Sequence, residues 1–360
     1  MFFFDNDYLD LVNLRKAISM KKALYYKTLE NGIVRCQLCP HYCLIGDNER
    51  GFCNVRINKE GILYSEFFEK VTSVGLDPIE KKPLYHFYPG SKILSVGSLG
   101  CTMKCLFCQN YRISQPTPQN YDDTSSFTVQ SIVNLANKYS DNIGIAFTYN
   151  EPYTFYEYMI EVAMLAKPAG LKTVMVTNGF FNREPLDALL PFIDAFNIDL
   201  KAFSESFYKT ITQSRLAPVK KTISRIAASK KHLEITNLVI PGMNDNYAEF
   251  EEMVRWIAGE TGERTVLHIS RYFPNFQMKI ASTPINILLD FYEIARKHLK
   301  YVYLGNIFDI ARDTTYCDKC NSTLIVREPG KISITGLNKL GNCTKCGNHV
   351  IDHIYYVQPR

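Results

Sequence analysis

The sequence predicts an α/β fold: a partial (β/α)6 TIM-like barrel, preceded by a four-cysteine metal segment and followed by a zinc-ribbon-like module. Two observations predict this arrangement. Short strand-like runs alternate with amphipathic helical patterns between residues 76 and 306. The eleven cysteines form three groups: four before this region, three directly after its first strand-like run, and four after the region. The predicted domains are therefore residues 1–75, 76–306 and 307–360.

Seven runs in the central region have the character of strands. They are short and rich in β-branched and aromatic residues. The runs are Ile93–Val96, Ile145–Tyr149, Thr173–Thr177, Ala195–Leu200, Leu233–Ile240, Thr265–Ile269 and Tyr301–Leu304. Apolar stripes with helical spacing lie between them, and such stripes are typical of helices that pack one face on a core. Repeated strand–helix units predict a parallel sheet that curves into an incomplete barrel.

The composition is that of an ordinary globular protein. Hydrophobic residues make up 46% of the chain, and the net charge of +5 comes from scattered basic residues, so nucleic-acid binding is not expected. Phe2–Phe4 are followed at once by Asp5 and Asp7, which predicts neither a signal peptide nor a membrane span. Closely spaced cysteines without a secretion signal favour metal binding over disulfides, and a cytoplasmic location.

The central cysteines, Cys101, Cys105 and Cys108, follow the first predicted strand with C-x3-C-x2-C spacing. Gly97 and Gly100 allow the chain to turn before them. Three thiolates can bind three irons of a [4Fe–4S] cluster and leave the fourth iron open for another ligand. A zinc site or part of a ferredoxin loop is the plainer interpretation, but ferredoxin runs have another spacing and continue to a fourth cysteine.

The N-terminal segment carries four cysteines, enough to close one metal site. Zinc and an auxiliary iron–sulfur cluster fit four thiolates equally well. His41 lies among them, as a ligand or as a supporting residue. The mixed apolar and basic stretch Leu9–Leu29 predicts one or two helices before this group. The four cysteines are Cys36, Cys39, Cys43 and Cys53.

A proline-rich connector, residues 77–90, leads directly into the strand that precedes the central cysteines. Its three prolines exclude a long helix. We expect it to cover that end of the barrel. Lys81, Lys82 and His86 are candidate pocket residues, although a packed connector is the favoured interpretation.

The C-terminal cysteines form two C-x2-C pairs, Cys317 with Cys320 and Cys343 with Cys346. This spacing predicts a structural zinc site, with a rubredoxin-like iron as the alternative. Leu324–Val326 and Ile332–Ile334 have strand character between the pairs. We expect the metal to stabilise a lobe too small for a large core, with docking of a partner as a further role.

Polar residues follow several of the predicted strands. In β/α barrels, the side chains that perform the chemistry gather where the strands end. Any single one of these residues is equally well explained as a cap or turn residue, but their joint placement predicts one site beside the central cysteines. The candidates are Asn150 and Glu151, Asn178, Asp199 and Lys201, and His268 and Arg271.

Together these motifs resemble the radical S-adenosylmethionine (SAM) superfamily. The resemblance is to its pyruvate formate-lyase-activating-enzyme-like branch, and more closely to the radical SAM enzymes of AmmeMemoRadiSam systems. It covers nearly the whole chain. The stretches that carry it are Cys36-x2-Cys39-Pro-His-x-Cys43, Gly51-Phe-Cys53-x-Val-Arg56, Asp77 to His86 and Cys101 to Asn110.

The resemblance implies an enzyme that binds SAM at the open iron and cleaves it reductively to a 5′-deoxyadenosyl radical. That radical would abstract hydrogen from a substrate, either a glycine of a protein or a small molecule. A flavodoxin or ferredoxin would supply the electron, and partner proteins of the same system are expected. No further catalytic residue is identified.

The resemblance also implies roles for the strand-end residues. Phe107 would pack near the adenine, and Asn178 near the ribose or the methionine. Asn150 and Glu151 stand where relatives carry Gly-Gly-Glu-Pro, which meets the SAM amino group. The remaining contacts, with the SAM carboxylate, ribose and adenine, would come from Asp199, Lys201, His268 and Arg271.

Two other hypotheses follow from the same residues. A metal-stabilised binding or adaptor protein would use two zinc sites and no SAM chemistry. A nucleic-acid binder would act through the C-terminal ribbon. The polar residues at the strand ends argue against the adaptor, because a pure adaptor does not need them. The nucleic-acid binder is the weaker of the two hypotheses and would require salt-sensitive binding.

Overall fold

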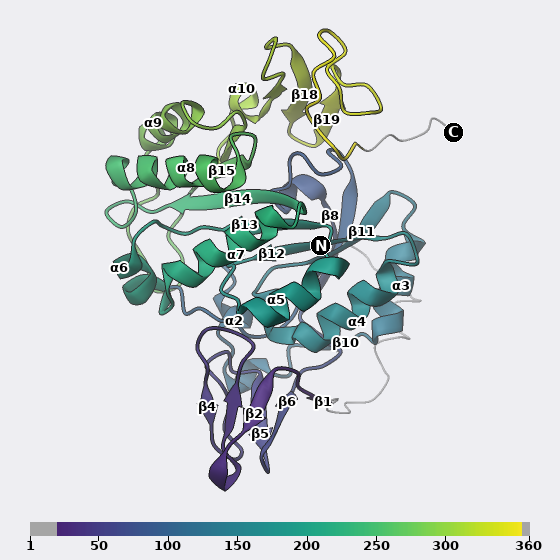
Figure 1. Cartoon of the computed structure of the whole chain (residues 1–360), viewed down its shortest axis with the longest axis vertical. Helices are drawn as coiled ribbons and strands as arrows, with labels where there is room; N and C mark the ends of the chain where they lie inside the picture. Colours follow the sequence, from purple (N-terminus) through teal and green to yellow (C-terminus); the bar gives the residue numbers. More distant parts are fainter. Residues whose placement is uncertain (1–19, 355–360) are drawn as a thin grey trace.

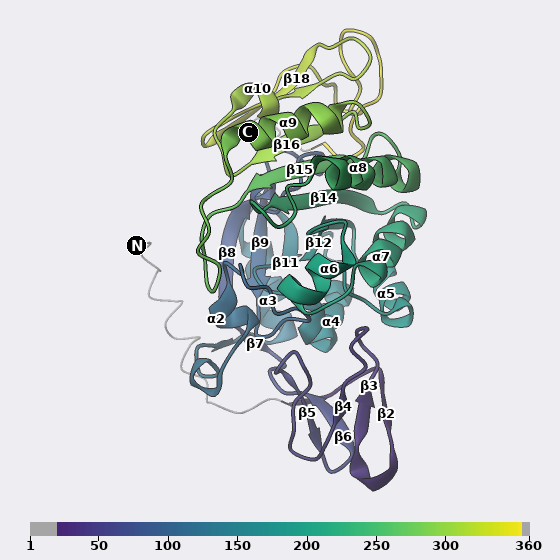
Figure 2. The same cartoon turned by 90° about the vertical axis from the view of Figure 1, so that its left-hand side faces the viewer.

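The computed structural model describes residues 20–354, which form three parts arranged along the longest axis of the molecule (Figure 1). A small β lobe from the N-terminal part of the chain lies at one end. A large sheet with its helices occupies the middle, and the C-terminal module lies at the other end (Figures 1 and 2). No helix within residues 20–354 combines the length and the apolar character that crossing a membrane requires.

The central sheet contains all seven predicted strands. Neighbouring strands among these seven run parallel, which confirms the parallel sheet. The predicted strands do not include an eighth, β8, which pairs antiparallel with β9 at the sheet edge. The order is β16-β15-β14-β13-β12-β11-β9-β8. The strands are β8 Ser73–Pro78, β9 Lys92–Gly97, β11 Asn142–Phe147, β12 Lys172–Thr177, β13 Ala195–Asp199, β14 His232–Val239, β15 Val266–Arg271 and β16 Val302–Gly305.

Helices follow most of these strands, as the apolar stripes predict. Thr128 and Asn246 accept hydrogen bonds from the first turns of α3 and α8, so polar caps fix where these helices begin. The stripe residues Ile132, Val219 and Val254 are fully buried. The helices are α2 Tyr111–Ser114, α3 Val129–Lys138, α4 Tyr156–Ala166, α5 Arg183–Leu189, α6 Glu205–Phe207, α7 Leu216–Ala228, α8 Tyr247–Thr261, α9 Ile285–Arg296 and α10 Ile310–Asp313.

The connector between β8 and β9 crosses the sheet at the end where the parallel strands begin. Asn197 of β13 donates to the Pro83 carbonyl at 2.7 Å. Glu234 of β14 accepts from the backbone N–H groups of Tyr85 and His86 at 2.9 and 2.8 Å. The connector is therefore packed, as favoured, but it covers the end of the sheet opposite the central cysteines. The expectation that it would cover the cysteine end was wrong. The connector precedes β9 and the cysteines follow it, so the length of this strand places them at opposite ends of the sheet.

The N-terminal lobe consists of strands rather than helices. The helix prediction for Leu9–Leu29 is wrong for residues 20–29, where β2 pairs antiparallel with β3 around Asn31 and Gly32, both at positive φ; residues 9–19 lie outside the described residues. β8 spans the predicted boundary at residue 75. The strands are β1 Lys21–Lys22, β2 Tyr26–Thr28, β3 Val34–Cys36, β4 Leu44–Ile45, β5 Arg56–Lys59, β6 Ile62–Ser65 and β7 Lys70–Val71, which pairs with β10 Ser125–Ser126.

The C-terminal module packs against the β16 edge of the sheet. Its strands are β17 Thr315–Tyr316, β18 Thr323–Glu328 and β19 Lys331–Ile334, so both predicted strands are confirmed. Leu324 shares a buried apolar cluster with Tyr301 and Tyr303 beside the sheet. Arg327 donates to the Tyr85 carbonyl at 2.7 Å. The module and the connector therefore close this side of the sheet together.

Candidate functional site

The loop with the three central cysteines begins where β9 ends and is held by neighbouring loops. The backbone N–H groups of Lys104 and Leu106 donate to carbonyls of the π-helical turn Tyr208–Thr212, at 2.9 and 3.1 Å. Gln277, after β15, donates its N–H to the Leu106 carbonyl at 3.0 Å. The loop is thus anchored by segments that follow two different strands, which fixes the cysteines at the end where the parallel strands finish.

Asn178, directly after β12, contacts the first of these cysteines. Its Nδ2 lies 3.6 Å from Cys101 Sγ and 3.0 Å from Thr102 Oγ1. The Met103 backbone N–H also points at Cys101 Sγ, 3.3 Å away. N–H donors directed at a cysteine sulfur are a way in which proteins adjust iron–sulfur clusters. Asn178 therefore lies directly beside the cysteine loop.

Glu151 is buried under Asn178. Its carboxylate accepts the Asn178 backbone N–H at 2.9 Å, the Tyr153 backbone N–H at 3.0 Å and the Thr177 hydroxyl at 2.8 Å. A carboxylate has about four acceptor positions, so about one is left. Burial raises the pKa of Glu151 to about 7, although the hydrogen bonds from Asn178, Tyr153 and Thr177 lower it.

Asn150 shapes the start of the cysteine loop. Its side chain accepts the Ser98 N–H at 3.0 Å and donates to the Gly100 carbonyl at 2.8 Å. The preceding residue, Tyr149, has φ of 71°, a conformation that glycine adopts without strain. Tyr149 therefore has a backbone conformation typical of glycine, and its ring packs against Gly97.

Lys201 and Asp199 form an ion pair beside the second cysteine. Lys201 Nζ lies 3.0 Å from Asp199 and 5.7 Å from the centre of the Phe107 ring. Burial lowers the pKa of Lys201, but attraction to Asp199 and Cys105 outweighs it and holds the pKa above its usual range. A permanent cation therefore stands beside the cysteines, where it offsets the negative charge that bound thiolates carry.

His268 and Arg271 are placed differently from the other candidates. Because β15 extends to Arg271, His268 is its third residue and lies within the strand, not at its end. His268 Nε2 donates to the buried Glu234 carboxylate at 2.6 Å, beside the connector at the other end of the sheet. Arg271 lies at the end of β15 and donates to the Thr283 carbonyl at 2.9 Å. Six of the eight candidates therefore lie around the cysteines, and His268 does not. Arg271 ends β15 at the cysteine end of the sheet, where it holds the Thr283 carbonyl.

The central cysteines fit a cluster with three protein ligands. Burial raises the pKa of Cys105 to about 12, so without a metal this thiol stays protonated at neutral pH. A bound metal replaces that proton, because the thiolate is the form that binds. The remaining eight cysteines belong to the N-terminal lobe and the C-terminal module.

The C-terminal cysteines form a compact group of four sulfur atoms. All lie within 4.8 Å of one another, and the Sγ atoms of Cys317 and Cys346 are 3.6 Å apart. The two halves repeat one geometry. Asn321 and Gly347, four residues after Cys317 and Cys343, have positive φ and donate to the carbonyls of those cysteines. This arrangement fits a single metal ion.

The N-terminal cysteines surround one enclosed pocket. Cys36 ends β3, Cys39 and Cys43 lie in the loop to β4, and Cys53 lies just before β5. His41 also lines this pocket, but its Nε2 donates to the Thr102 carbonyl at 2.8 Å. This ring nitrogen therefore links the lobe to the central cysteine loop and is not free to bind a metal.

Two residues beside the central cysteines were not predicted from the sequence. Thr102 connects Cys101 to Asn178, and Lys104 lies within electrostatic reach of both Cys101 and Cys53. In the sequence, only their positions between the cysteines indicated a role for them. Their interaction partners belong to other strands and to the N-terminal lobe, so the sequence of the loop alone could not predict these contacts.

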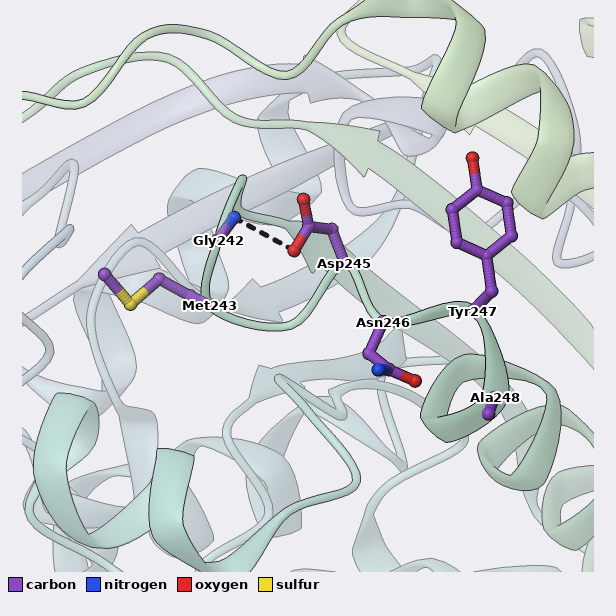
Figure 3. Close-up of a pocket in the computed structure, with 6 residues that line it drawn as sticks. All are labelled: Gly242, Met243, Asp245, Asn246, Tyr247 and Ala248. Atoms are coloured by element: carbon purple, nitrogen blue, oxygen red, sulfur yellow. Dashed lines mark hydrogen bonds between the residues drawn. The ribbon is translucent and has the colours of Figure 1, made fainter.

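An open pocket also lies in the loop between β14 and α8 (Figure 3). The Asp245 carboxylate points at the Gly242 N–H, 2.9 Å away, and Met243 points away from both (Figure 3). The acidic group is therefore used to hold the loop. We assign no chemistry to this pocket.

Comparisons with known proteins support the interpretation of the central cysteine loop. The model of the radical SAM superfamily matches residues 95–257. An uncharacterized protein of Methanocaldococcus jannaschii is 38% identical over 338 residues, covering 92% of this chain and 99% of the relative. The pyruvate formate-lyase-activating enzyme of Listeria monocytogenes is 23% identical over 180 residues, covering 47% of this chain and 70% of that enzyme.

A solved structure is similar as well. A radical SAM methyltransferase from Sphaerobacter thermophilus aligns with a TM-score of 0.49 at 17% identity, covering 61% of this chain and 67% of that one. The superfamily match includes the C-x3-C-x2-C loop, and the alignment with the archaeal relative extends over nearly the whole chain. With its cysteine loop, parallel sheet and superfamily match, this chain belongs to the radical SAM superfamily.

Proposed function

We propose that this protein is a radical SAM enzyme that holds a [4Fe–4S] cluster on Cys101, Cys105 and Cys108 and binds SAM at the open iron. When bound, the cluster and SAM supply a one-electron cleavage that yields a 5′-deoxyadenosyl radical, which takes hydrogen from the substrate. The observation that carries the proposal is that Asn178 contacts the cysteine loop and the Lys201 ammonium lies beside it, because these residues follow different strands of the sheet.

The residues around the loop have separate tasks in this proposal. Lys201 supplies the positive charge for the SAM carboxylate. Glu151 offers its remaining acceptor position to the SAM ammonium, and Phe107 offers a ring face to the adenine. Asn178 orients Cys101 and borders the same space. Asn150 shapes the loop through Ser98 and Gly100 rather than binding SAM directly.

For the substrate we propose a glycine of a partner protein, and a small molecule remains the alternative. Support comes from relatives named pyruvate formate-lyase-activating enzyme and putative glycyl-radical enzyme activating enzyme, each of which aligns with less than half of this chain. A flavodoxin or ferredoxin is the proposed electron donor. The adaptor hypothesis without SAM chemistry is not favoured, because the chain belongs to the radical SAM superfamily.

Anaerobic reconstitution with iron and sulfide tests the proposed activity. We expect a brown protein that converts SAM to 5′-deoxyadenosine and methionine when dithionite is present, measured by liquid chromatography. The control omits dithionite and is expected to give no product. A reconstituted protein that binds iron and sulfide but forms no 5′-deoxyadenosine would contradict the proposal.

SAM affinity should depend on pH through Glu151. The pKa of this carboxyl is raised to about 7 by burial, so it is largely neutral at pH 6 and ionised at pH 8. Because the ionised form attracts the SAM ammonium, the dissociation constant should fall as pH rises through this range. Glu151→Gln should weaken binding by about 1.5–3 kcal/mol at pH 8, about ten- to hundred-fold, and remove most of the pH dependence. Equilibrium binding of SAM to the reconstituted protein at both pH values measures this, and an unchanged pH profile in the variant would exclude the role.

For the C-terminal module we propose a zinc ion with a structural role. Cys320→Ser should remove about one zinc per chain, because a structural site uses all four of its thiolates. Metal analysis measures the loss, and hydrogen exchange should show faster opening in residues 317–350. The control Ser322→Ala changes a residue beside the site and should leave the zinc content unchanged. Retention of zinc by Cys320→Ser would exclude this site.

A further inference from the structure

The four N-terminal cysteines surround a small cavity. Its volume is about 20 Å³, and all four cysteines line it. The compact C-terminal group provides the comparison within the same molecule. Its sulfurs lie within 4.8 Å of one another, near the spacing of about 3.8 Å that follows from tetrahedral Zn–S bonds of about 2.3 Å.

The N-terminal four, all within the described residues, do not form such a compact group. In a [4Fe–4S] cluster each cysteine binds a different iron, so the four sulfurs surround a core and stand further apart than around one ion. A wider ring of cysteines around an enclosed pocket fits that arrangement. The spacing of the sulfur atoms thus favours an iron–sulfur cluster over a single zinc ion, whereas the sequence leaves the two equal.

A buried arginine in the same pocket supports a negatively charged occupant. Arg56 is 1% exposed and lines the pocket, and its Nε has no hydrogen-bond partner in the described structure. Its other guanidinium nitrogens bind the Glu157 carboxylate and the Leu24 carbonyl. A buried N–H without an acceptor is destabilising, so an acceptor in the pocket would remove a penalty. Four thiolates around a 2+ core carry net negative charge and supply sulfur acceptors.

A backbone N–H group is already directed at one of the four sulfurs. The Phe52 N–H lies 3.4 Å from Cys43 Sγ. The same kind of contact occurs in the central loop, where the Met103 N–H lies 3.3 Å from Cys101 Sγ. The N-terminal pocket therefore shares its donor pattern with the site proposed for the SAM-binding cluster.

The two cysteine sites lie directly against each other. Thr102 follows Cys101 in the central loop and also lines the N-terminal pocket. Gly100 has φ of 88°, and a Cβ on it would lie 2.6 Å from the Cys53 carbonyl oxygen, so only glycine allows this approach. Lys104 interacts electrostatically with Cys101 and Cys53. One loop therefore forms part of the wall of both sites.

We propose that Cys36, Cys39, Cys43 and Cys53 hold a second [4Fe–4S] cluster, closed by four protein ligands, which passes single electrons to the cluster on the central cysteines. The relay rests on the function proposed above, whereas the presence of the second cluster does not. In each transfer a reduced flavodoxin loses one electron to the N-terminal cluster, which goes from the 2+ to the 1+ state. That cluster returns to 2+ when the electron moves to the central cluster, which becomes 1+.

The first experiment counts the clusters. After anaerobic reconstitution, the wild-type protein should contain about eight iron and about eight sulfide per chain, and a variant with all three central cysteines changed to alanine about four of each. This variant should show the electron paramagnetic resonance signal of a reduced [4Fe–4S] cluster after dithionite treatment. Added SAM should leave that signal unchanged, because no iron is open.

Zinc without sulfide in this three-cysteine variant would overturn the proposal. The readout does not need SAM cleavage, so it is independent of the proposed activity. If the variant does not fold, the wild-type protein gives the same decision. It should show two reduced clusters of which only one responds to SAM, and a single cluster would contradict the inference. The control variant Cys320→Ala should lose zinc and keep its full iron content.

The second experiment tests the relay, using Cys39→Ala combined with Cys43→Ala. With dithionite, a small reductant, this variant should retain the central cluster and form 5′-deoxyadenosine. With reduced flavodoxin as the only donor, the rate should fall to that of the sample without donor. Wild-type rates with flavodoxin would exclude the relay, and so would loss of activity with both reductants while the signal of the central cluster is retained.

Discussion

Cys105→Ala is expected to abolish SAM cleavage. Cys105 is the buried middle cysteine of the central loop, and its removal leaves two thiolates for a cluster that needs three. Without the cluster there is no source for the electron, so formation of 5′-deoxyadenosine should fall on the order of 10⁶-fold or more, below detection. The measurement is product formation under anaerobic conditions with dithionite.

Met103→Leu is the matched control for Cys105→Ala. Met103 lies in the same loop and is also buried, and leucine has a similar volume. This variant should keep its cluster and its activity within a small factor. Activity retained by Cys105→Ala would contradict the assignment of the central cysteines, and activity lost by both variants would show that the loop is sensitive to any change.

Glu234→Leu is expected to cause the largest loss of stability. The Glu234 carboxylate is fully buried and accepts the N–H groups of Tyr85 and His86, and it also accepts His232 and His268 at 2.9 and 2.6 Å. Removing it leaves several buried donors without an acceptor. The free energy of unfolding should fall by about 3–5 kcal/mol, measured by urea titration.

The same carboxylate predicts how stability depends on pH. Burial raises the pKa of Glu234, but the hydrogen bonds from His232 and His268 outweigh this and hold it well below its usual value of 4.5. An acid whose pKa is lowered by folding stabilises the protein above its unfolded pKa. This contribution should therefore be complete above about pH 4.5 and should be lost as pH falls through the lower, folded value.

Glu251→Gln is the control for Glu234→Leu. Glu251 also pairs with a histidine and an arginine, but it lies at the surface on α8. Surface substitutions of this kind change stability little. A loss of stability for Glu234→Leu as small as that for Glu251→Gln would exclude a central role for the buried carboxylate.

Much of the fold could be predicted because it depends on local patterns. The seven parallel strands are short runs rich in β-branched and aromatic residues, and the main helices have clear 3.6-residue periodicity. Residues 20–29 were predicted as helix and are strands, because the pairing of β2 with β3 outweighs their local preference. β8 was missed because its sequence, Ser-Val-Gly-Leu-Asp-Pro, carries turn residues and becomes a strand only by pairing with β9.

The sequence by itself determined the superfamily motif, the three cysteine groups and the parallel sheet, since each depends on spacing along the chain. The tertiary structure decided the rest, since it depends on contacts between distant segments. His268 lies in mid-strand beside Glu234, because β15 is longer than its pattern predicts. Thr102 joins the two cysteine sites, because the N-terminal lobe packs on the central loop. The spacing of cysteines along the sequence identifies candidate metal ligands. The distances between their sulfur atoms, which distinguish a site for one ion from a site for a cluster, are set only when the lobe folds.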